Sequence, residues 1–407
     1  MVPAAPSDGS KRLAVMDGLR GLAIFLVFWS HSFLTGYRPG IGVGSFSLSV
    51  TPLVFGGSLG VELFFFISGF VLFVPYARAE LEKRREPTLG HFIDRRFIKI
   101  VPSYYLALAA VLAFFNLSVE DENSRPWQIL THLTFTHSFW RGTFAKLSGG
   151  VFWTLAIEVQ FYVLFPLIAT FMRRRPLQTY AFLVAIAAAY RLWLDATGRN
   201  YDYFWVLQLP DQIDLFAAGM LAAYVYVKFG HRTAEARVRA WATAAAVLAT
   251  AALLWLMNDF SDVTQAGGID AHSVWENDNR FAVSITIAAV ALGSLFAQGW
   301  WRAIVACPPL VWLSTISYNL YLWHDSIVTQ CQVSGFPCAG RVTPWASIDP
   351  WNQQYFVGYA VVSIAIATLM TYAVERPLLK LGTRGAYERF IRDPLRALAI
   401  RAASRPP

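Results

Sequence analysis

The chain has 407 residues, of which 56% are hydrophobic and 15% are charged, and its formal net charge is +8. Soluble globular proteins average about 45–50% apolar and about 25% charged residues. The composition therefore excludes an ordinary soluble enzyme, a disordered protein and a coiled coil. The 15 Trp and 17 Tyr residues suit a protein with wide membrane interfaces, where aromatic rings anchor.

Apolar stretches of spanning length recur along the chain and predict the fold class. A transmembrane helix needs roughly 20 mainly apolar residues. We expect ten such stretches, at about 14–35, 52–76, 97–117, 149–172, 177–194, 203–229, 240–258, 279–298, 310–331 and 353–375. The sequence thus predicts an all-α polytopic membrane helix bundle, with one transmembrane domain over residues 1–375 and a basic tail over residues 376–407.

The distribution of basic residues predicts the orientation. Most of the 34 Lys and Arg residues lie in segments on the side of the N-terminus. By the positive-inside rule, both termini are expected in the cytoplasm, in a bacterial inner membrane. The largest outer loops are then about 118–148, 259–278 and 332–352. The basic tail either lies on anionic lipid as an amphipathic segment or frays and only fixes the topology.

The first span carries three ionisable residues on one helix face. Asp17, Arg20 and His31 are separated by 3 and 11 residues, and both spacings return close to the same side of a helix. Arg20 and His31 are then about 16 Å apart along the axis, with His31 in the outer half. Gly18 and Gly21 would let another backbone or a ligand approach this helix closely.

Other spans also contain polar residues at depth, where they are costly and often functional. They are Glu62, Glu158, Tyr162, Asp214, Tyr321 and His324, and Pro210 breaks a helix beside Asp211 and Asp214. Such residues either tie helices together by hydrogen bonds or line a site. Two histidines, acids and Tyr hydroxyls at similar depth favour a buried polar chamber suited to proton transfer.

Three basic residues stand at the expected cytoplasmic mouth of the third span. Arg95, Arg96 and Lys99 are either positive-inside anchors or a phosphate cradle, because guanidinium forks suit phosphate.

Other kinds of site have little support. The sequence has no Gly-rich phosphate loop and no H-E-x-x-H motif, and His132 and His137 are poorly spaced for a metal on a helix. The basic segments lack the interleaved aromatic residues of a nucleic-acid platform. We expect neither a metal nor a nucleic-acid partner.

Six motifs occur in a fixed order along the chain. They are DGLRG leading to His31, GVELFFFISGF, RRFIKIVPSY, FWTLAIEVQFYVLFP, ISYNLYLWH and VERP. Together they resemble the acyltransferase family 3 membrane acyltransferases, over most of the chain. The resemblance implies transfer of an acyl group, commonly acetyl from acetyl-CoA, to a hydroxyl of a sugar, glycolipid, peptidoglycan or macrolide, as in modification of cell-envelope carbohydrate.

The resemblance also implies roles for particular residues. The family's Arg-x10-His pattern falls on Arg20 and His31, so His31 would be catalytic, either as general base or as acyl carrier. Asp17 lies in the same motif, and Glu158 matches the acidic residue of a W-x-L-x-x-E motif. We group Asp17, Arg20, His31 and Glu158 as the catalytic candidates.

Two departures affect the binding residues. Arg95 and Arg96 match the family's basic pair and would bind acyl-CoA, but Lys99 replaces a second Arg and loses the bidentate fork. The sixth span has Gln212 where relatives often have Arg, which leaves Asp214 without its usual Arg neighbour. The expected acceptor-binding residues are Glu62, Tyr162, Asp214, Tyr321 and His324.

Three further expectations complete the sequence-based interpretation. The fused esterase-like domain of some relatives is not expected. A proton-coupled transporter or flippase is the alternative function, since buried acids and histidines also relay protons. Cys331 and Cys338 either form a disulfide or remain two free thiols.

Overall fold

The computed structural model describes residues 8–31, 40–43, 46–114, 125–144, 150–336, 351–388 and residue 392. Nearly all of these residues are helical. The helices are α1 (Asp8–Ser30), α2 (Thr51–Phe55), α3 (Gly60–Leu81), α4 (Leu89–Phe114), α5 (Arg125–Leu133), α6 (Trp153–Arg174), α7 (Pro176–Ala196), α8 (Tyr203–Val206), α9 (Leu209–Phe229), α10 (Ala236–Phe296), α11 (Gly299–Val305), α12 (Pro308–Ser334), α13 (Trp351–Met370) and α14 (Arg376–Tyr387).

Shorter elements connect these helices. A two-stranded antiparallel hairpin, β1 (Gly40–Val43) and β2 (Phe46–Ser49), pairs Gly40 with Ser49 and Val43 with Phe46. Short turns of 3-10 helix are η2 (Gly56–Leu59), η4 (His137–Phe139) and η5 (Gly230–Ala234), and η7 (Thr371–Glu375) is a π-helical turn after α13.

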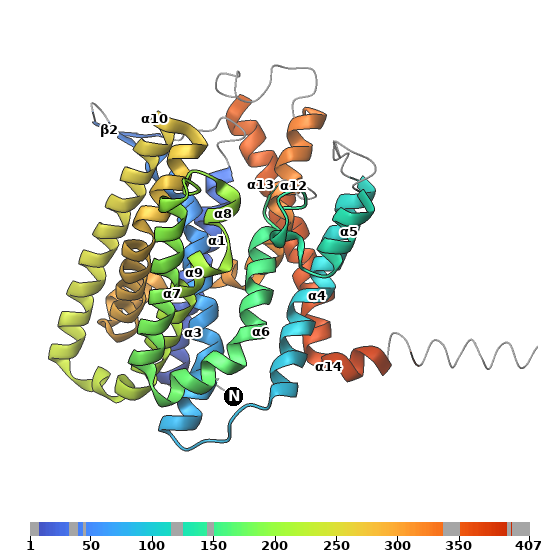
Figure 1. Ribbon diagram of the computed structural model, residues 1–407. Coiled ribbons are helices and arrows are strands. Elements are labelled where there is room, and N and C mark those ends of the chain that lie inside the picture. The colour runs from blue at the N-terminus through green and yellow to red at the C-terminus, as the bar shows by residue number, and fades with distance from the viewer. Residues whose placement is uncertain are drawn as a thin grey trace, which may run out of the picture.

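The long helices form one bundle, in which they run roughly side by side (Figure 1). The most extensive packing joins α3 to α9, α1 to α12, α12 to α13 and α7 to α9. We call the end of the bundle where α1 begins and where α3 connects to α4 the N-side. The hairpin β1–β2 and helix α5 lie toward the opposite side.

The helices confirm a polytopic membrane protein. Eight helices in the described part of the chain are long and apolar enough to cross a bilayer, and the bent pair α11 and Pro308–Cys331 makes a ninth span. The 61 residues of α10 would extend about 90 Å if straight, which is far more than a bilayer requires. Each of the ten stretches expected from the sequence is helical over most of its described length.

Helix α10 is a hairpin of two arms that turns at Gly268, where φ is +70°. Contacts between residues on either side of this turn show that the helix folds back. The indole of Trp275 donates to Asp259 at 2.6 Å, and a Cβ on Gly293 would contact Ala246. Figure 1 shows the two arms running in opposite directions. The loop conformation expected at 259–278 is therefore wrong, because these residues stay helical on both sides of the turn at Gly268 and Trp275 pairs with Asp259 across the two arms.

The expected break at Pro210 is confirmed. Pro210 lies in the first turn of α9, directly after the short helix α8, where a missing amide hydrogen costs nothing. Asp211 and Asp214 consequently lie near the start of a helix and are fully buried in the bundle.

The segment after the last span turns aside from the bundle. Helix α14 lies across the N-side, nearly at right angles to the long helices (Figure 1), and the Thr383 hydroxyl hydrogen-bonds to Asp94 of α4. Of the two cysteines considered for a disulfide, Cys331 is a buried free thiol and Cys338 lies outside the described residues.

Helix α1 contacts the α11–α12 region through its two motif glycines. A Cβ on Gly18 would collide with the carbonyl oxygen of Val305, and one on Gly21 with that of Leu310. The expected close approach of another backbone is therefore confirmed, and the contact fixes which face of α1 meets α12.

We expect Gly21→Ala to destabilise the protein because its methyl group would push the backbone of α12 away. Overpacking of this kind costs about 1–3 kcal/mol. Thermal unfolding in detergent measures the loss. The matched control is Gly90→Ala on α4, where a Cβ meets nothing within 4 Å. Equal unfolding temperatures for the two variants would contradict the packing role.

Candidate active site

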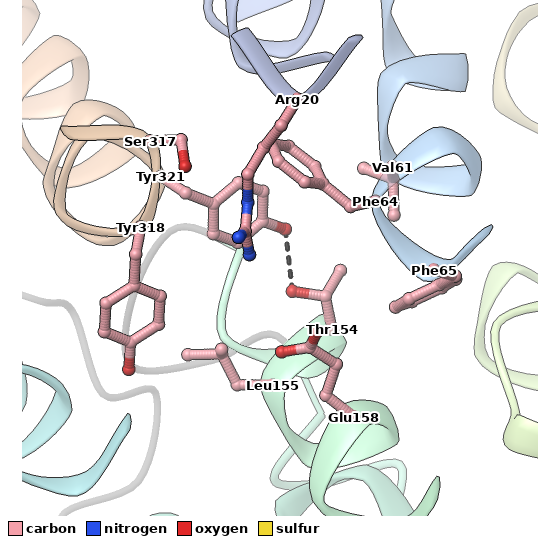
Figure 2. Close-up of a pocket in the computed structure, with 10 residues that line it drawn as sticks. All are labelled: Arg20, Val61, Phe64, Phe65, Thr154, Leu155, Glu158, Ser317, Tyr318 and Tyr321. Atoms are coloured by element: carbon pink, nitrogen blue, oxygen red, sulfur yellow. Dashed lines mark hydrogen bonds between the residues drawn. The ribbon is translucent and has the colours of Figure 1, made fainter. Parts of the chain in front are cut away.

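A cavity between four helices contains the side chain of Arg20. Figure 2 shows the guanidinium group directed into this cavity from α1, toward Glu158 of α6. Helices α3 and α12 supply the remaining walls. The lining residues are Arg20, Val61, Phe64, Phe65, Thr154, Leu155, Glu158, Ser317, Tyr318 and Tyr321.

Arg20 enters the cavity without forming an ion pair to any described residue, and its Nε has no hydrogen-bond partner among them. Glu158 instead accepts a hydrogen bond from Ser68 of α3. A half-buried guanidinium group without an anion is costly, so the cavity is electrostatically suited to an anionic or strongly polar ligand.

The hydroxyl of Tyr321 is held rigidly at the far end of the cavity. It accepts a hydrogen bond from the Thr154 hydroxyl at 2.8 Å, which Figure 2 shows as a dashed line. It also lies 3.1 Å from the carbonyl oxygen of Val151, to which it donates. These two bonds fix the distance between α12 and the start of α6.

Two histidines meet beyond Tyr321. His31 follows the last residue of α1, and its Nδ1 lies 3.3 Å from Nε2 of His324 on α12. The rings are perpendicular, with centroids 4.6 Å apart. His324 Nδ1 donates to the carbonyl oxygen of Tyr321 at 2.9 Å, so the histidine pair lies one helical turn beyond the cavity. The expected proximity of His31, Tyr321 and His324 is confirmed.

The three basic residues of α4 occupy different environments. Arg95 is exposed. Arg96 lines an apolar groove between α4 and α6, with its guanidinium carbon 5.9 Å from the ring centre of Tyr162. Lys99 forms an ion pair with Glu375 of η7 and lies 5.3 Å from the ring centre of Tyr318. They share one end of the bundle but do not converge as a ready cradle.

Asp17 differs from its neighbours in the motif. Its side chain is exposed and does not line the cavity, although it is close enough to Arg20 for electrostatic interaction.

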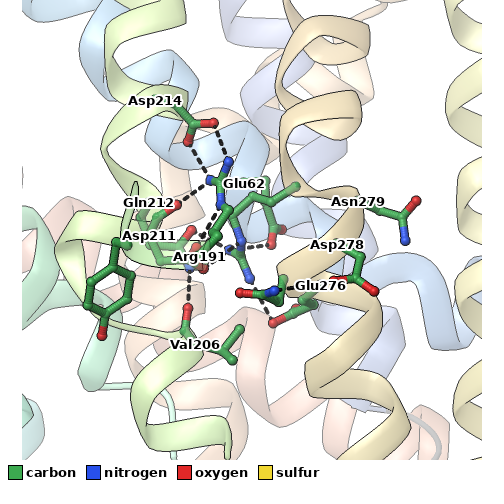
Figure 3. A network of polar contacts seen from close by, with 12 residues as sticks. Glu62, Arg191, Val206, Asp211, Gln212, Asp214, Glu276, Asp278 and Asn279 are labelled. Carbon is green, nitrogen blue, oxygen red and sulfur yellow. Dashed lines mark hydrogen bonds and ion pairs between the residues drawn. The ribbon is translucent and has the colours of Figure 1, made fainter. Parts of the chain in front are cut away.

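Glu62 and Asp214 lie in a separate buried network (Figure 3). Four carboxylates from α3, α9 and α10 form ion pairs with two guanidinium groups from α7 and α10. The network consists of Glu62, Arg191, Asp211, Gln212, Asp214, Glu276 and Arg280, and every member is buried. We call it the charge network.

Each arginine of the charge network joins at least two acids. Arg191 binds Asp214 with two parallel bonds of 3.0 and 2.9 Å and Asp211 with one of 2.7 Å. Arg280 lies 3.0 Å from Asp211, 3.3 Å from Glu62 and 2.9 Å from Glu276. The expectation that Asp214 lacks an Arg neighbour is therefore wrong, because Arg191 approaches it from another helix.

Three residues with a clear place in these sites were missed from the sequence. In the sequence, Arg191 and Arg280 look like basic residues at the ends of spans. The helical periodicity does not indicate that their side chains point into the bundle. Asp325 lies 3.7 Å from His31, and its position directly after His324 is the signal that was available.

A second histidine pair holds together the segment at residues 125–144, which follows α4. His132 of α5 stacks on His137 of η4 with centroids 4.1 Å apart and planes 6° from parallel. His132 donates to the Gln128 carbonyl at 2.7 Å, and His137 donates to the Phe152 carbonyl at 3.0 Å. Burial lowers the pKa of His132 to about 3 and also lowers the pKa of His137.

Comparisons with known proteins agree with the motifs. The model of the acyltransferase-3 family, described as "Acyltransferase domain", matches residues 13–372. O-acetyltransferase OatA of Staphylococcus aureus (strain NCTC 8325 / PS 47) is 26% identical over 340 residues, which cover 77% of this chain and 50% of the relative. Peptidoglycan O-acetyltransferase OatA of Listeria monocytogenes is 23% identical over 398 residues, which cover 91% and 56%.

The chain thus spans about half the length of these curated relatives. No solved structure is significantly similar to it.

We expect Arg280→Met to destabilise the bundle strongly, because Glu62 and Glu276 would lose their shared buried partner. Removing one member of a buried ion pair costs about 3–5 kcal/mol. Thermal unfolding in detergent measures the effect. The control is Arg232→Met, which removes only the exposed pair with Glu235 and should leave the unfolding temperature unchanged. A small loss for Arg280→Met would argue against a bracing role.

We expect the segment around the His132–His137 stack to open as the pH falls. The pKa of both rings is lowered in the folded state, so only the open state binds protons below about pH 6.5. The closed segment is therefore most stable above that pH. As the pH falls toward 4, the equilibrium constant for opening rises about tenfold per pH unit for each histidine. Amide-exchange protection of residues 125–144 measures it. His132→Phe keeps a stacked ring, and an undiminished pH dependence in that variant would contradict the assignment.

Proposed function

Because this chain belongs to the acyltransferase-3 family, we propose that it is a membrane O-acyltransferase that moves an acyl group, typically acetyl, from acyl-CoA to a hydroxyl group. One observation carries the proposal. The unpaired cation Arg20 faces a cavity, and the His31–His324 pair lies one helical turn beyond the end of that cavity. The cavity for a polar acyl donor and a candidate base therefore lie next to each other in the bundle.

The donor enters from the N-side in this proposal. The positive-inside bias assigns that side to the cytoplasm, where acyl-CoA is made. Arg95, Arg96 and Lys99 then face the polyanionic nucleotide, and Arg20 lies close enough to Lys99 for their charges to interact. The pantetheine arm is about as long as half the roughly 30 Å hydrocarbon core, so the thioester extends past Arg20 toward His31.

The distance between Arg20 and His31 decides between two roles for the arginine. Eleven residues of helix separate them by about 16 Å, which is more than both side chains together bridge along the axis. Arg20 is therefore assigned to holding the donor rather than to stabilising the reacting carbonyl at His31. Glu158, on the opposite wall of the cavity, limits the anionic charge accepted there.

His31 serves the reaction by one of two routes that use the same nitrogen. As a general base, it removes the proton of the acceptor hydroxyl while the oxygen attacks the thioester carbonyl, and the CoA thiolate leaves. As an acyl carrier, it attacks the carbonyl itself, and the CoA thiolate leaves. The acceptor oxygen then takes the acyl group from the ring, and its hydroxyl proton passes to the CoA thiolate. Accumulation of acylated protein in the absence of acceptor distinguishes the routes.

The acceptor is proposed to be a hydroxyl-bearing glycan of the cell envelope. Two relatives are named as an O-acetyltransferase and a peptidoglycan O-acetyltransferase, and a glycan outside the cytoplasm meets His31 from the opposite side. Of the five expected acceptor-binding residues, Tyr321 and His324 lie near His31. Tyr162 faces the groove, and Glu62 and Asp214 belong to the charge network.

The charge network is the observation that favours the alternative of a proton-coupled transporter. Four buried carboxylates against two guanidinium groups resemble the groups of proton relays. Purified protein in lipid vesicles decides between the functions, because a transporter does not release free CoA thiol from acetyl-CoA.

We expect His31→Ala to lower acyl transfer by at least about 100-fold, since loss of a general base or nucleophile has effects of that size. Release of CoA thiol and transfer of labelled acetyl to envelope glycan in membrane vesicles measure it. The matched control is His91→Ala, an exposed histidine on α4, which should retain full activity. Near-normal transfer by folded His31→Ala would reject the catalytic assignment.

We expect the double variant Arg95→Gln, Arg96→Gln to bind acetyl-CoA roughly tenfold more weakly at low salt, with a smaller effect at high salt because ions screen the lost attraction. Calorimetry or competition binding in detergent gives the dissociation constants. The control removes the same charge elsewhere on the N-side, at the exposed Arg232 and Arg237. Unchanged binding by the α4 variant would identify these residues as membrane anchors.

A further inference from the structure

The hydrogen bonds of His324 determine which of its nitrogens carries hydrogen. Its Nδ1 lies 3.0 Å from the Leu320 carbonyl and 2.9 Å from the Tyr321 carbonyl. Both oxygens only accept, so Nδ1 must donate. The ring is fully buried and has no carboxylate within ion-pair distance among the described residues, which favours the neutral form. The Nε2 that faces His31 therefore presents a lone pair.

The same reasoning extends to His31. Its Nδ1 lies 2.9 Å from the Val27 carbonyl oxygen and 3.3 Å from His324 Nε2, which are both acceptors. Nδ1 therefore carries the hydrogen in the neutral ring. The free lone pair of His31 is consequently on Nε2, which is the atom available to take a proton or an acyl group.

A buried carboxylate lies beside this reactive nitrogen. Asp325 Oδ1 is 3.7 Å from His31 Nε2, and the Asp325 side chain is only 4% exposed. The second oxygen, Oδ2, has no hydrogen-bond partner in the part of the chain that the structure describes. Within that part, His31 is the only cationisable group at ion-pair distance from Asp325.

We propose that Asp325 is the positioning residue for His31, and that it stabilises the positive charge that forms on the ring during acyl transfer. This inference rests on the proposed function. A neutral ring gains little from the carboxylate, but the ring becomes cationic when Nε2 takes a proton or an acyl group. The attraction is then strong, because both groups lie in a low-dielectric interior.

The timing of this charge predicts a kinetic signature. An interaction that exists only while the reaction proceeds raises kcat and leaves substrate binding nearly unchanged. A residue that only supports the fold, or that contacts the donor, would instead alter KM or the amount of folded protein.

The test compares Asp325→Asn with wild-type protein in lipid vesicles, with acetyl-CoA as donor. We expect kcat to fall about 100-fold, which is typical of removing a preorganised charge-stabilising group, while the KM for acetyl-CoA changes less than threefold. Asp325→Glu should recover most of the activity. Ser326→Ala is the neighbouring control. Its hydroxyl is buried and forms no hydrogen bond to either histidine among the described residues, so this variant should retain wild-type kcat. Retention of full kcat by folded Asp325→Asn would overturn the proposal.

A double-mutant comparison separates this proposal from the proposed function. In the His31→Ala background, Asp325→Asn should cause no further loss, because no ring charge remains to be stabilised. Wild-type protein that releases no CoA thiol would reject the function itself, whereas an inactive His31→Ala beside a fully active Asp325→Asn would reject only the role of Asp325. If Asp325→Asn does not fold, the pair Asp325→Glu and Asp325→Gln, equal in size and different in charge, decides the question. Equal kcat values in that pair would overturn it.

Discussion

The contact between α1 and α12 is the constraint on which the rest of the site depends. Gly18 and Gly21 let the backbone of α1 approach the α11–α12 region directly, and this close approach fixes the rotation of α1. The same rotation turns Arg20 into the cavity and His31 onto His324. Tyr359 of α13 strengthens the far end of this contact by donating a 2.6 Å hydrogen bond to the Phe28 carbonyl. A small slip of α1 would displace Arg20 and His31 together.

The two polar systems in the bundle have opposite character. In the charge network, each guanidinium group has two or more carboxylates, and those bonds join α3, α7, α9 and α10. At the cavity, Arg20 forms no ion pair within the described part of the chain, and Asp325 has His31 as a partner at 3.7 Å. Paired charges stabilise a fixed arrangement, whereas unpaired charges leave interaction energy available to a ligand or a transition state.

Much of the fold and part of the site follow from the sequence alone. Periodicity correctly predicts the helices and brings Arg20 and His31 to one face, and the spacing of Tyr321 and His324 brings them to the same face of α12. The partners of the buried acids were not predictable, because Arg191 and Arg280 come from helices whose relative rotation depends on packing. The continuation of α10 through residues 259–278 was missed for a similar reason, since the Trp275–Asp259 bond exists only after the two arms meet.

The place where α1 ends has a consequence for the charge on His31. The last helical residue is Ser30, so the ring lies at the carboxyl end of a long helix, inside the bundle. The aligned peptide dipoles of a helix place about half a negative charge at that end, and the protein interior screens it far less than water would. The backbone of α1 therefore attracts a cation at the same point as Asp325. The glycines that position α1 therefore also direct its dipole at the ring of His31.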